Sequence, residues 1–174
     1  TQRSVALSKE TTFGMKPAKN MAKLLPRTET SLNVNFESFQ SEEIRTDMQR
    51  AASIVGFEKV EGDVKGELAA GQWAWAFAAA LRGAFGAEAK PPIIKKTANG
   101  QGEKNGKILV VPQTAHSTDS FTIEDWFKDI GLSRQYLGCR VSKLSLEVEP
   151  NGIASVTVTF LGQRGEESAT QYFT

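Results

Sequence analysis

The chain has only one cysteine and one histidine among its 174 residues. Cys139 therefore cannot form an intramolecular disulfide, and zinc sites built on several Cys or His ligands are excluded by count. We interpret Cys139 as a small buried hydrophobic residue. His116 lies among turn-type polar residues, which is a poor setting for a catalytic triad. The sequence predicts no cofactor, no metal site and no enzymatic activity.

Long apolar runs are also missing. No stretch of about 18 apolar residues occurs, so the sequence predicts no membrane insertion. The longest apolar run, residues 74–81, is typical of a packed helix. The first residues lack the apolar block of a signal peptide. The chain begins at Thr1, so either an initiator Met was removed or the sequence is part of a longer protein.

Motifs for phosphate and acid–base chemistry are incomplete. In the loop around Gly106 and Lys107, Gln101 stands where a phosphate loop needs glycine, and Ile108 replaces its Ser or Thr. Adjacent acidic residues occur three times, and we expect them to be solvated. These pairs are Glu42-Glu43, Glu124-Asp125 and Glu166-Glu167.

Charge is unevenly distributed, although the net charge of +1 predicts no polyanionic partner. Residues 1–27 carry a balance of +5 and residues 90–107 a balance of +4, so the remainder carries −8. The basic segments are either solvated loops or segments that dock on acidic surfaces of neighbouring copies. In the second case the candidate arm contacts are Arg3, Lys9, Lys16 and Lys19.

Residues 57–68 alternate between charged and apolar or glycine residues, the period of a strand with one buried face. Val60, Val64 and Leu68 point toward the core. The opposite face must meet water, either outside a monomer or inside an assembled channel. The residues on that face, our candidates for a lumen lining, are Lys59, Glu61, Asp63, Lys65 and Glu67.

The rest of the chain is rich in strand patterns. Helical spacing of apolar residues predicts one helix over about 72–85, and Pro91-Pro92 prevents its continuation. Residues 144–161 alternate around the turn Pro150-Asn151-Gly152 and predict a hairpin. Other strands are predicted near residues 32–36, 93–94, 108–111 and 121–126.

We therefore expect a mainly β fold, a β-sandwich or barrel of about six or seven strands with one flanking helix. Residues 1–30 and 163–174 show no period and are expected to be extended arms, ordered by neighbouring molecules. The β domain then spans residues 31–162. The glycine- and lysine-rich segment 95–107 is expected to be a long loop, either functional or disordered.

The serial order of these elements resembles the major tail tube proteins of long-tailed (siphovirus-type) bacteriophages. The resemblance covers about residues 30–162 and depends on the order of the segments, since no single motif is specific. The segments that carry it are SLNVNFESFQSEEIRTDMQ, VEGDVKGEL, WAFAAALRG, SFTIEDWF and GCRVSKLSLEVEPNGIASVTVTFLG.

The resemblance implies a structural subunit of the virion tail, assembled in the host cytoplasm. Such subunits form stacked hexameric or pseudo-hexameric rings, here of six chains or of three longer duplicated chains, with a continuous inner β-barrel. The tube surrounds a tape measure protein, conducts DNA without tight binding, and is capped by tail terminator and tail-tip proteins. Loops and arms join the rings, which makes Lys95, Lys96, Lys104 and Lys107 candidate ring-stacking residues.

Two other function classes remain open from the residues themselves. A stand-alone β-sandwich binding module, carbohydrate- or adhesin-like, would need an exposed aromatic cluster. A small enzyme would need a pocket with perturbed titratable groups, for which the sequence gives no pointer.

Overall fold

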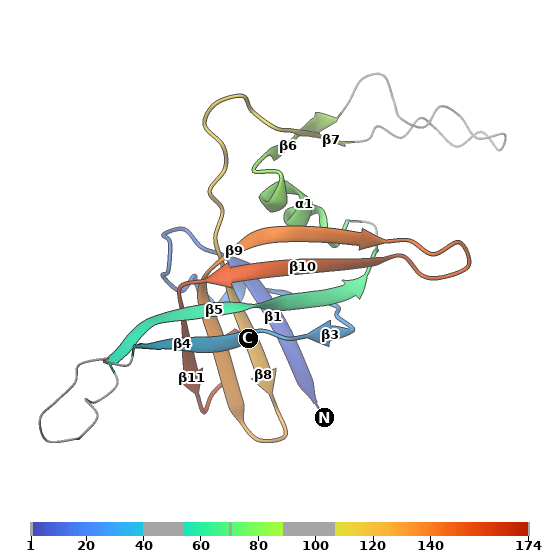
Figure 1. Cartoon of the computed structure of the whole chain (residues 1–174). Coiled ribbons are helices and arrows are strands. Elements are labelled where there is room, and N and C mark those ends of the chain that lie inside the picture. Colours follow the sequence, from blue (N-terminus) through green and yellow to red (C-terminus); the bar gives the residue numbers. More distant parts are fainter. Residues whose placement is uncertain (1, 40–53, 70, 89–106, 174) are drawn as a thin grey trace, which may run out of the picture. The chain divides into compact units, whose positions relative to one another are not determined.

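The computed structural model describes residues 2–39, 54–69, 71–88 and 107–173 (Figure 1). The chain divides into a larger unit, residues 1–68 with 120–174, and a smaller unit, residues 69–119. The larger unit contains a single turn of 3-10 helix (Lys19–Met21) and nine strands. The strands are β1 (Arg3–Lys9), β2 (Lys23–Leu24), β3 (Glu29–Thr30), β4 (Asn33–Phe39), β5 (Ile54–Glu67), β8 (Phe121–Phe127), β9 (Leu132–Glu147), β10 (Ser155–Gly162) and β11 (Arg164–Ser168).

All nine strands belong to one antiparallel sheet. Seven of them follow one another in the order β2-β1-β8-β9-β10-β5-β3, while β11 also pairs with β9 and β4 also pairs with β5. The prediction of a mainly β fold is confirmed. The hairpin expected at residues 144–161 is present as the end of β9 and β10, with Ser155 opposite Glu147.

Strand β9 divides this sheet into two layers. Its first half, up to Cys139, pairs with β8 and with β11, so both of its edges are occupied. Its second half, from Arg140 to Glu147, pairs with β10. We call β2, β1, β8, β11 and the first half of β9 the β8 layer, and the second half of β9 with β10, β5, β3 and β4 the β5 layer. The strands of the two layers cross in Figure 1.

The core of the larger unit lies between these layers. Ile123 and Tyr136 of the β8 layer are fully buried, as are Val64 and Val158 of the β5 layer. The Tyr136 hydroxyl donates a hydrogen bond of 3.0 Å to the carbonyl oxygen of Leu32, which ties one layer to the other. Burial of each Val or Ile side chain stabilises the fold by about 1.5–3 kcal/mol. The expected apolar face of β5 is therefore confirmed at its centre.

The N-terminal residues form a strand where we expected an arm. Residues 3–9 make β1, which pairs with β8 along its whole length, from Arg3 opposite Phe127 to Lys9 opposite Phe121. Four consecutive residues, Val5 to Ser8, are buried. A strand covered on both faces shows no alternation, so the period-2 pattern missed it.

The C-terminal residues are also folded onto the larger unit. Residues 164–168, expected in an arm, form β11, which pairs with β9. Phe173 is buried, and the backbone N–H groups of Tyr172 and Phe173 donate to the Glu124 carboxylate at 2.6 Å and 2.7 Å. The C-terminal residues are mostly polar, so their sequence pattern does not predict that they pack on the larger unit.

The smaller unit contains α1 (Ala74–Ala80) and an antiparallel pair, β6 (Ala84–Glu88) and β7 (Lys107–Val110). The helix is shorter than the predicted 72–85. It ends because Arg82 adopts a φ of 52°, and the Gly83 N–H then bonds to the Ala78 carbonyl at 3.0 Å. This is the Schellman geometry, in which the position of Arg82 is usually occupied by glycine.

We predict that Leu7→Ala destabilises the protein by about 2–5 kcal/mol, because Leu7 is buried in β1 and its removal leaves a cavity. Urea unfolding followed by circular dichroism would measure the change. Met21→Ala is the control, since Met21 is exposed and its truncation should cost less than about 0.5 kcal/mol. Equal stability of Leu7→Ala and the parent protein would contradict the packing of β1.

Candidate functional site

The charged face predicted from the alternation exists on β5. Lys59, Glu61 and Glu67 are exposed, and Asp63 and Lys65 are half-buried. The intervening Val60 and Val64 are fully buried. Leu68, expected on the buried face, lies just beyond the strand and is partly exposed.

Neighbouring strands extend this charged face into a broad polar surface. Residues directly opposite one another in an antiparallel ladder share a face. Thr157 lies opposite both Lys65 and Ser145, and Thr159 lies opposite Asp63 and Lys143. We call this surface the polar face. It comprises Lys59, Glu61, Asp63, Lys65 and Glu67 of β5, Ser155, Thr157, Thr159 and the apolar Leu161 of β10, Arg140, Lys143, Ser145 and Glu147 of β9, Glu29 of β3, and Asn33 and Asn35 of β4.

The polar face is weakly negative. It carries five carboxylates against three lysines and Arg140, a formal balance of −1. The Lys59 and Glu61 side chains form an ion pair at 2.6 Å, and Lys65 approaches Glu147 at 3.5 Å. The hydrogen bond that Lys59 donates to Glu61, followed by the charge of Glu61, raises the pKa of Lys59 above its usual value. Such exposed pairs compensate charge locally and add little stability.

Within the part of the chain that the structure describes, the β5 layer has two open edges. The row formed by β3 and β4 pairs there with β5 on one side only. Likewise, among the described residues, the second half of β9 pairs only with β10. Unpaired N–H and C=O groups on such edges are a template for another strand.

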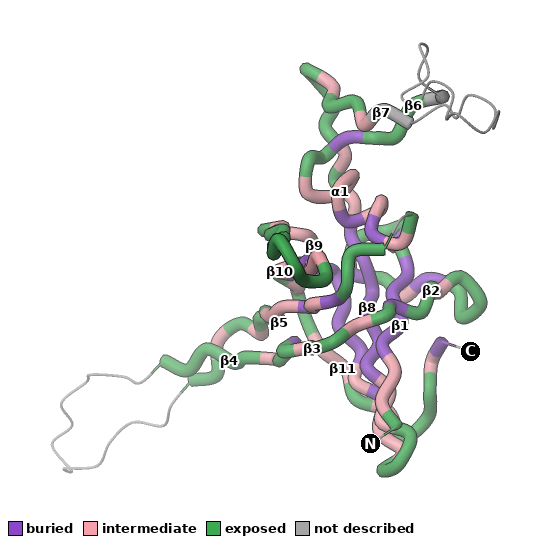
Figure 2. Tube along the Cα trace, turned by 90° about the vertical axis from the view of Figure 1, so that its right-hand side faces the viewer, coloured by how far each residue is buried: buried purple, intermediate pink, exposed green. Residues whose placement is uncertain are grey.

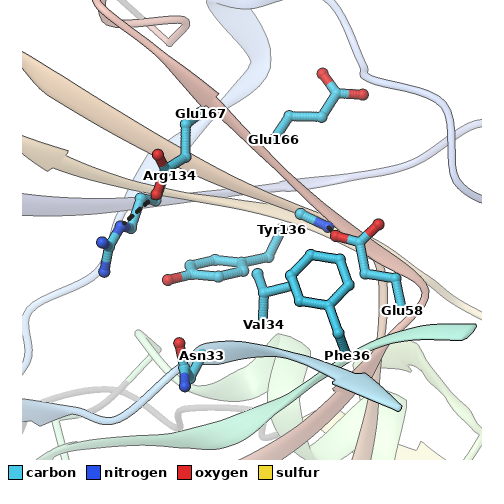
Figure 3. Close-up of a pocket in the computed structure, with 9 residues that line it drawn as sticks. Asn33, Val34, Phe36, Glu58, Arg134, Tyr136, Glu166 and Glu167 are labelled. Carbon is cyan, nitrogen blue, oxygen red and sulfur yellow. Dashed lines mark hydrogen bonds and ion pairs between the residues drawn. The ribbon is translucent and has the colours of Figure 1, made fainter. Parts of the chain in front are cut away.

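A cavity of about 330 Å³ lies between β4, β5, β9 and β11 (Figure 3). Val34, Phe36 and Tyr136 form its apolar wall, and Arg134 is paired with Glu167 at 3.0 Å at its rim. The Glu58 carboxylate accepts a hydrogen bond of 2.7 Å from the Gly165 N–H and so bridges the layers beside the cavity. Every ionised group named here has a partner, so the cavity offers apolar surface and no reactive group.

The residues that we considered as candidate arm contacts interact with other residues of the same chain. Arg3 forms an ion pair with Asp125, and the hydrogen bonds that Arg3 donates to this carboxylate raise the pKa of Arg3. Lys16 pairs with Glu166 at 2.6 Å. Lys16 and Lys19 both lie over the Tyr172 ring, while Lys9 ends β1.

The loop candidates are mostly not placed. Lys95, Lys96 and Lys104 lie outside the described residues, and Lys107 is the first residue of β7. A role of any arm or loop candidate in contacts between copies stays a prediction.

Buried carboxylates are the feature that the sequence pattern missed. The expectation of solvated acids is wrong for Glu124 and Asp125, which are fully buried. Glu10 is also buried, and it accepts hydrogen bonds from Ser120, Thr122 and the backbone N–H groups of Gly14 and Gly138, all between 2.6 Å and 2.8 Å. These donors offset the cost of removing a carboxylate from water. One feature of the sequence does indicate this burial: Glu124 and Asp125 stand inside an apolar segment, directly after Ile123.

The described residues provide no centre for metal chemistry. No group of three or more His, Cys, Asp or Glu side chains among them could hold a metal ion. Within the same part of the chain, no helix has the length and apolar character needed to cross a bilayer.

Comparison with known proteins gives one family and a set of shared folds. The family model described as phage tail tube protein matches residues 1–174. No curated protein matches the chain by sequence.

Several solved structures contain chains of similar fold. A chain of the anti-feeding prophage (AFP) baseplate, 6-fold symmetrised, has a TM-score of 0.58 at 9% identity, covering 96% of this chain and 92% of that one. A chain from the tail of an empty GTA particle, with C6 symmetry, has a TM-score of 0.50 at 11% identity, covering 96% of both chains. A chain of the PVC sheath–tube complex in the extended state has a TM-score of 0.50 at 11% identity, covering 95% of this chain and 88% of that one. At identities this low, the structural similarity establishes that the chains share a fold and shows nothing about function.

We predict that the only thiol of the chain is unreactive in the folded protein. Cys139 is fully buried, and burial, assisted by the charge of Glu10, raises the pKa of its thiol far above the usual value. The nucleophilic thiolate is therefore absent near neutral pH. A maleimide at pH 7.5 should label less than a tenth of the folded protein and one equivalent of protein unfolded in urea. Full labelling of the folded protein would contradict this burial.

Proposed function

The chain belongs to the phage tail tube protein family, and from this premise we propose that its copies join edge to edge so that the polar face lines the lumen of the tube. Membership of the family makes the chain a structural subunit of a phage-like tail, which is not the stand-alone binding module considered above. We further propose that its role involves no catalysis and no cofactor. The observation that carries the proposal is a polar sheet face bounded by two open edges.

The strand directions support such a closure. The four rows of the β5 layer, β9, β10, β5 and β3–β4, are each antiparallel to the next. The two open edges therefore run in opposite directions. Rotating copies about one axis brings the β4 edge of one copy beside the β9 edge of the next in antiparallel pairing. A closed ring leaves no edge unpaired.

The faces of the β5 layer decide which side lines the lumen. Its buried face packs on the β8 layer, which also holds the segment at Gly14 through Glu10 and the C-terminal residues Tyr172 and Phe173 through Glu124. Within the larger unit, the polar face is the side of the β5 layer that carries the exposed charges of Lys59, Glu61 and Glu67. We propose a ring of six copies, or of three copies of a longer duplicated chain; the six-fold symmetry named for solved chains of this fold supports the number six.

We also propose the partners that a tail tube needs. The lumen would hold a tape measure protein and later pass DNA, while terminator and tip proteins would bind the tube ends. A formal balance of −1 on the polar face suits passage, because an excess of positive contacts to phosphate would retain DNA. The likeness to a chain of a baseplate structure supports partners at an end of the tube.

We predict that a cysteine on the polar face is reached by small reagents but not by bulky ones after assembly. Glu61→Cys is suitable because Glu61 is exposed and Cys139 is buried. In unassembled protein both a small maleimide and a large polymer-linked maleimide should react. In tubes the small reagent should still react, and the large one should lose at least about nine-tenths of its labelling, since only the tube ends admit it.

The control for this labelling is Gln171→Cys. Gln171 is exposed in the C-terminal segment that covers the opposite layer, so both reagents should label it in tubes. Equal labelling of Glu61→Cys tubes by both reagents would place the polar face outside and refute its role as the lumen lining.

We predict that reversing the charge of the polar face makes the lumen retain DNA. The double variant Glu61→Lys with Glu67→Lys changes two exposed residues and should leave folding and tube formation intact. Short duplex DNA should sediment with the variant tubes at about 50 mM salt and dissociate at about 200 mM, since phosphate contacts weaken with salt. Parent tubes should retain little DNA at either concentration. The control Asp129→Lys with Ala169→Lys and Gln171→Lys adds the same four charges at exposed positions of the β8–β9 turn and the C-terminal segment, and retention by it alone would contradict the assignment.

A further inference from the structure

The two ends of the β5 layer are unusually apolar for exposed surface. Beyond the last pair with β10, Val60 opposite Gly162, strand β5 continues with β4 as a two-stranded ribbon. Its large apolar side chains are between 57% and 84% exposed. We call this set the apolar ribbon. It comprises Phe36, Phe39, Ile54, Val55 and Phe57.

The apolar ribbon is exposed on both faces. Phe36 and Phe39 are three residues apart on β4, so they point to opposite sides. Phe36 lines the cavity beside Tyr136 (Figure 3), whereas Phe39 lies against Gly56, where an added Cβ would meet the Phe39 ring at 2.5 Å. Figure 2 shows β4 and the adjoining part of β5 largely as exposed or intermediate. A two-stranded ribbon is marginally stable alone, so both faces need a covering partner.

A second apolar cluster lies at the opposite end of the same layer. The end of β9 and the turn that follows it present Leu146, Val148 and Ile153, which are between 50% and 72% exposed. We call these three residues the turn cluster. Strand pairing places the two clusters at opposite ends of β5. Glu67, at one end of β5, pairs with Ser155 beside the turn, and Ile54, at the other end, pairs with Phe39. In Figure 1 the outer end of the β4–β5 pair and the turn between β9 and β10 lie at opposite tips of the layer.

We propose that these two clusters are the two halves of a head-to-tail contact: the apolar ribbon of one copy packs against the turn cluster of a second copy in the adjacent ring. The inference rests on the proposed function, because stacking rings brings unlike ends of the β5 layer together. A contact between unlike surfaces on opposite ends repeats without closing and builds a filament. Both surfaces are apolar, so their mutual burial provides the driving force.

The edge pairing and the apolar clusters then have separate roles. The open edges of β4 and β9 close a ring through backbone hydrogen bonds, while the apolar ribbon and the turn cluster join one ring to the next. The cavity beside Phe36 adds a recess lined by Val34 and Tyr136, into which an aliphatic side chain of the second copy fits by size and chemistry. The assembled tube leaves neither cluster in water.

Serine substitutions test the two clusters separately. The ribbon variant is Phe39→Ser with Phe57→Ser, the turn variant is Val148→Ser with Ile153→Ser, and the control is Met21→Ser with Ile130→Ser, which changes two equally exposed residues elsewhere. All three should keep the melting temperature of the unassembled protein. The ribbon and turn variants should form rings in negative-stain micrographs but lose tubes, measured as at least a tenfold drop in sedimentable protein. The control should form tubes normally.

Each alternative result is decisive. Normal tubes from the ribbon and turn variants would overturn the inference and leave the proposed function standing. Loss of rings as well as tubes would place the apolar ribbon in the ring contact and overturn the stacking contact. Loss of tubes by the control would show that exposed apolar area in general, and not these clusters, drives stacking. A parent protein that forms neither rings nor tubes would refute the proposed function itself.

Cross-linking provides a readout that does not depend on variants losing assembly. Phe39→Cys and Val148→Cys proteins are mixed, assembled and treated with a short bis-maleimide, with Cys139 silent because it is buried. Covalent dimers should appear in mixed tubes and be at least tenfold fewer in tubes of either protein alone. Dimers in tubes of Phe39→Cys alone would show a contact between like ends and overturn the head-to-tail arrangement.

Discussion

The structure depends on one strand that belongs to two layers. Up to Cys139, β9 is hydrogen-bonded on both edges within the β8 layer, and from Arg140 it is the edge of the β5 layer. The change occurs at Gly138, whose φ of 66° suits glycine and whose N–H donates to Glu10. A side chain there would also press on Phe13 and Gln163. Because one continuous backbone serves both layers, the polar face is held in a fixed position relative to the layer that covers its back.

Buried carboxylates extend this constraint to the chain ends. Glu10 gathers donors from β8, β9 and the segment at Gly14, and Glu124 holds the backbone at Tyr172 and Phe173. A buried carboxylate without its donors would be strongly destabilising, so each one fixes the path of the chain around it. The segment at Gly14 and the C-terminal residues are thereby held on the β8 layer.

The sequence predicts what depends on alternation and little of what depends on long-range pairing. The faces of β5 and the hairpin around Asn151 follow from period 2, since one face of each strand is wet. Strand β1 was missed because both of its faces are covered, and Glu124 was misplaced because its partners are backbone groups far along the chain. The helix end at Arg82 required a positive φ from a residue that rarely adopts one. The open edges and the apolar ribbon become visible only when the pairing order is known.

The composition of β5 changes where its neighbours end. Residues 59–67, which lie within the sheet, carry charge on their exposed face, whereas Ile54, Val55 and Phe57 extend beyond β10 and are apolar. A protein that stays monomeric has the opposite requirement, because a protruding ribbon should be charged to prevent association. Strand β5 carries charge on its paired face and apolar residues on its unsupported end. This pattern is typical of a subunit whose ends are covered by other copies. In the proposed tube, the same strand provides a water-exposed wall along its length and an apolar contact at its tip, as stacked rings around an aqueous channel require.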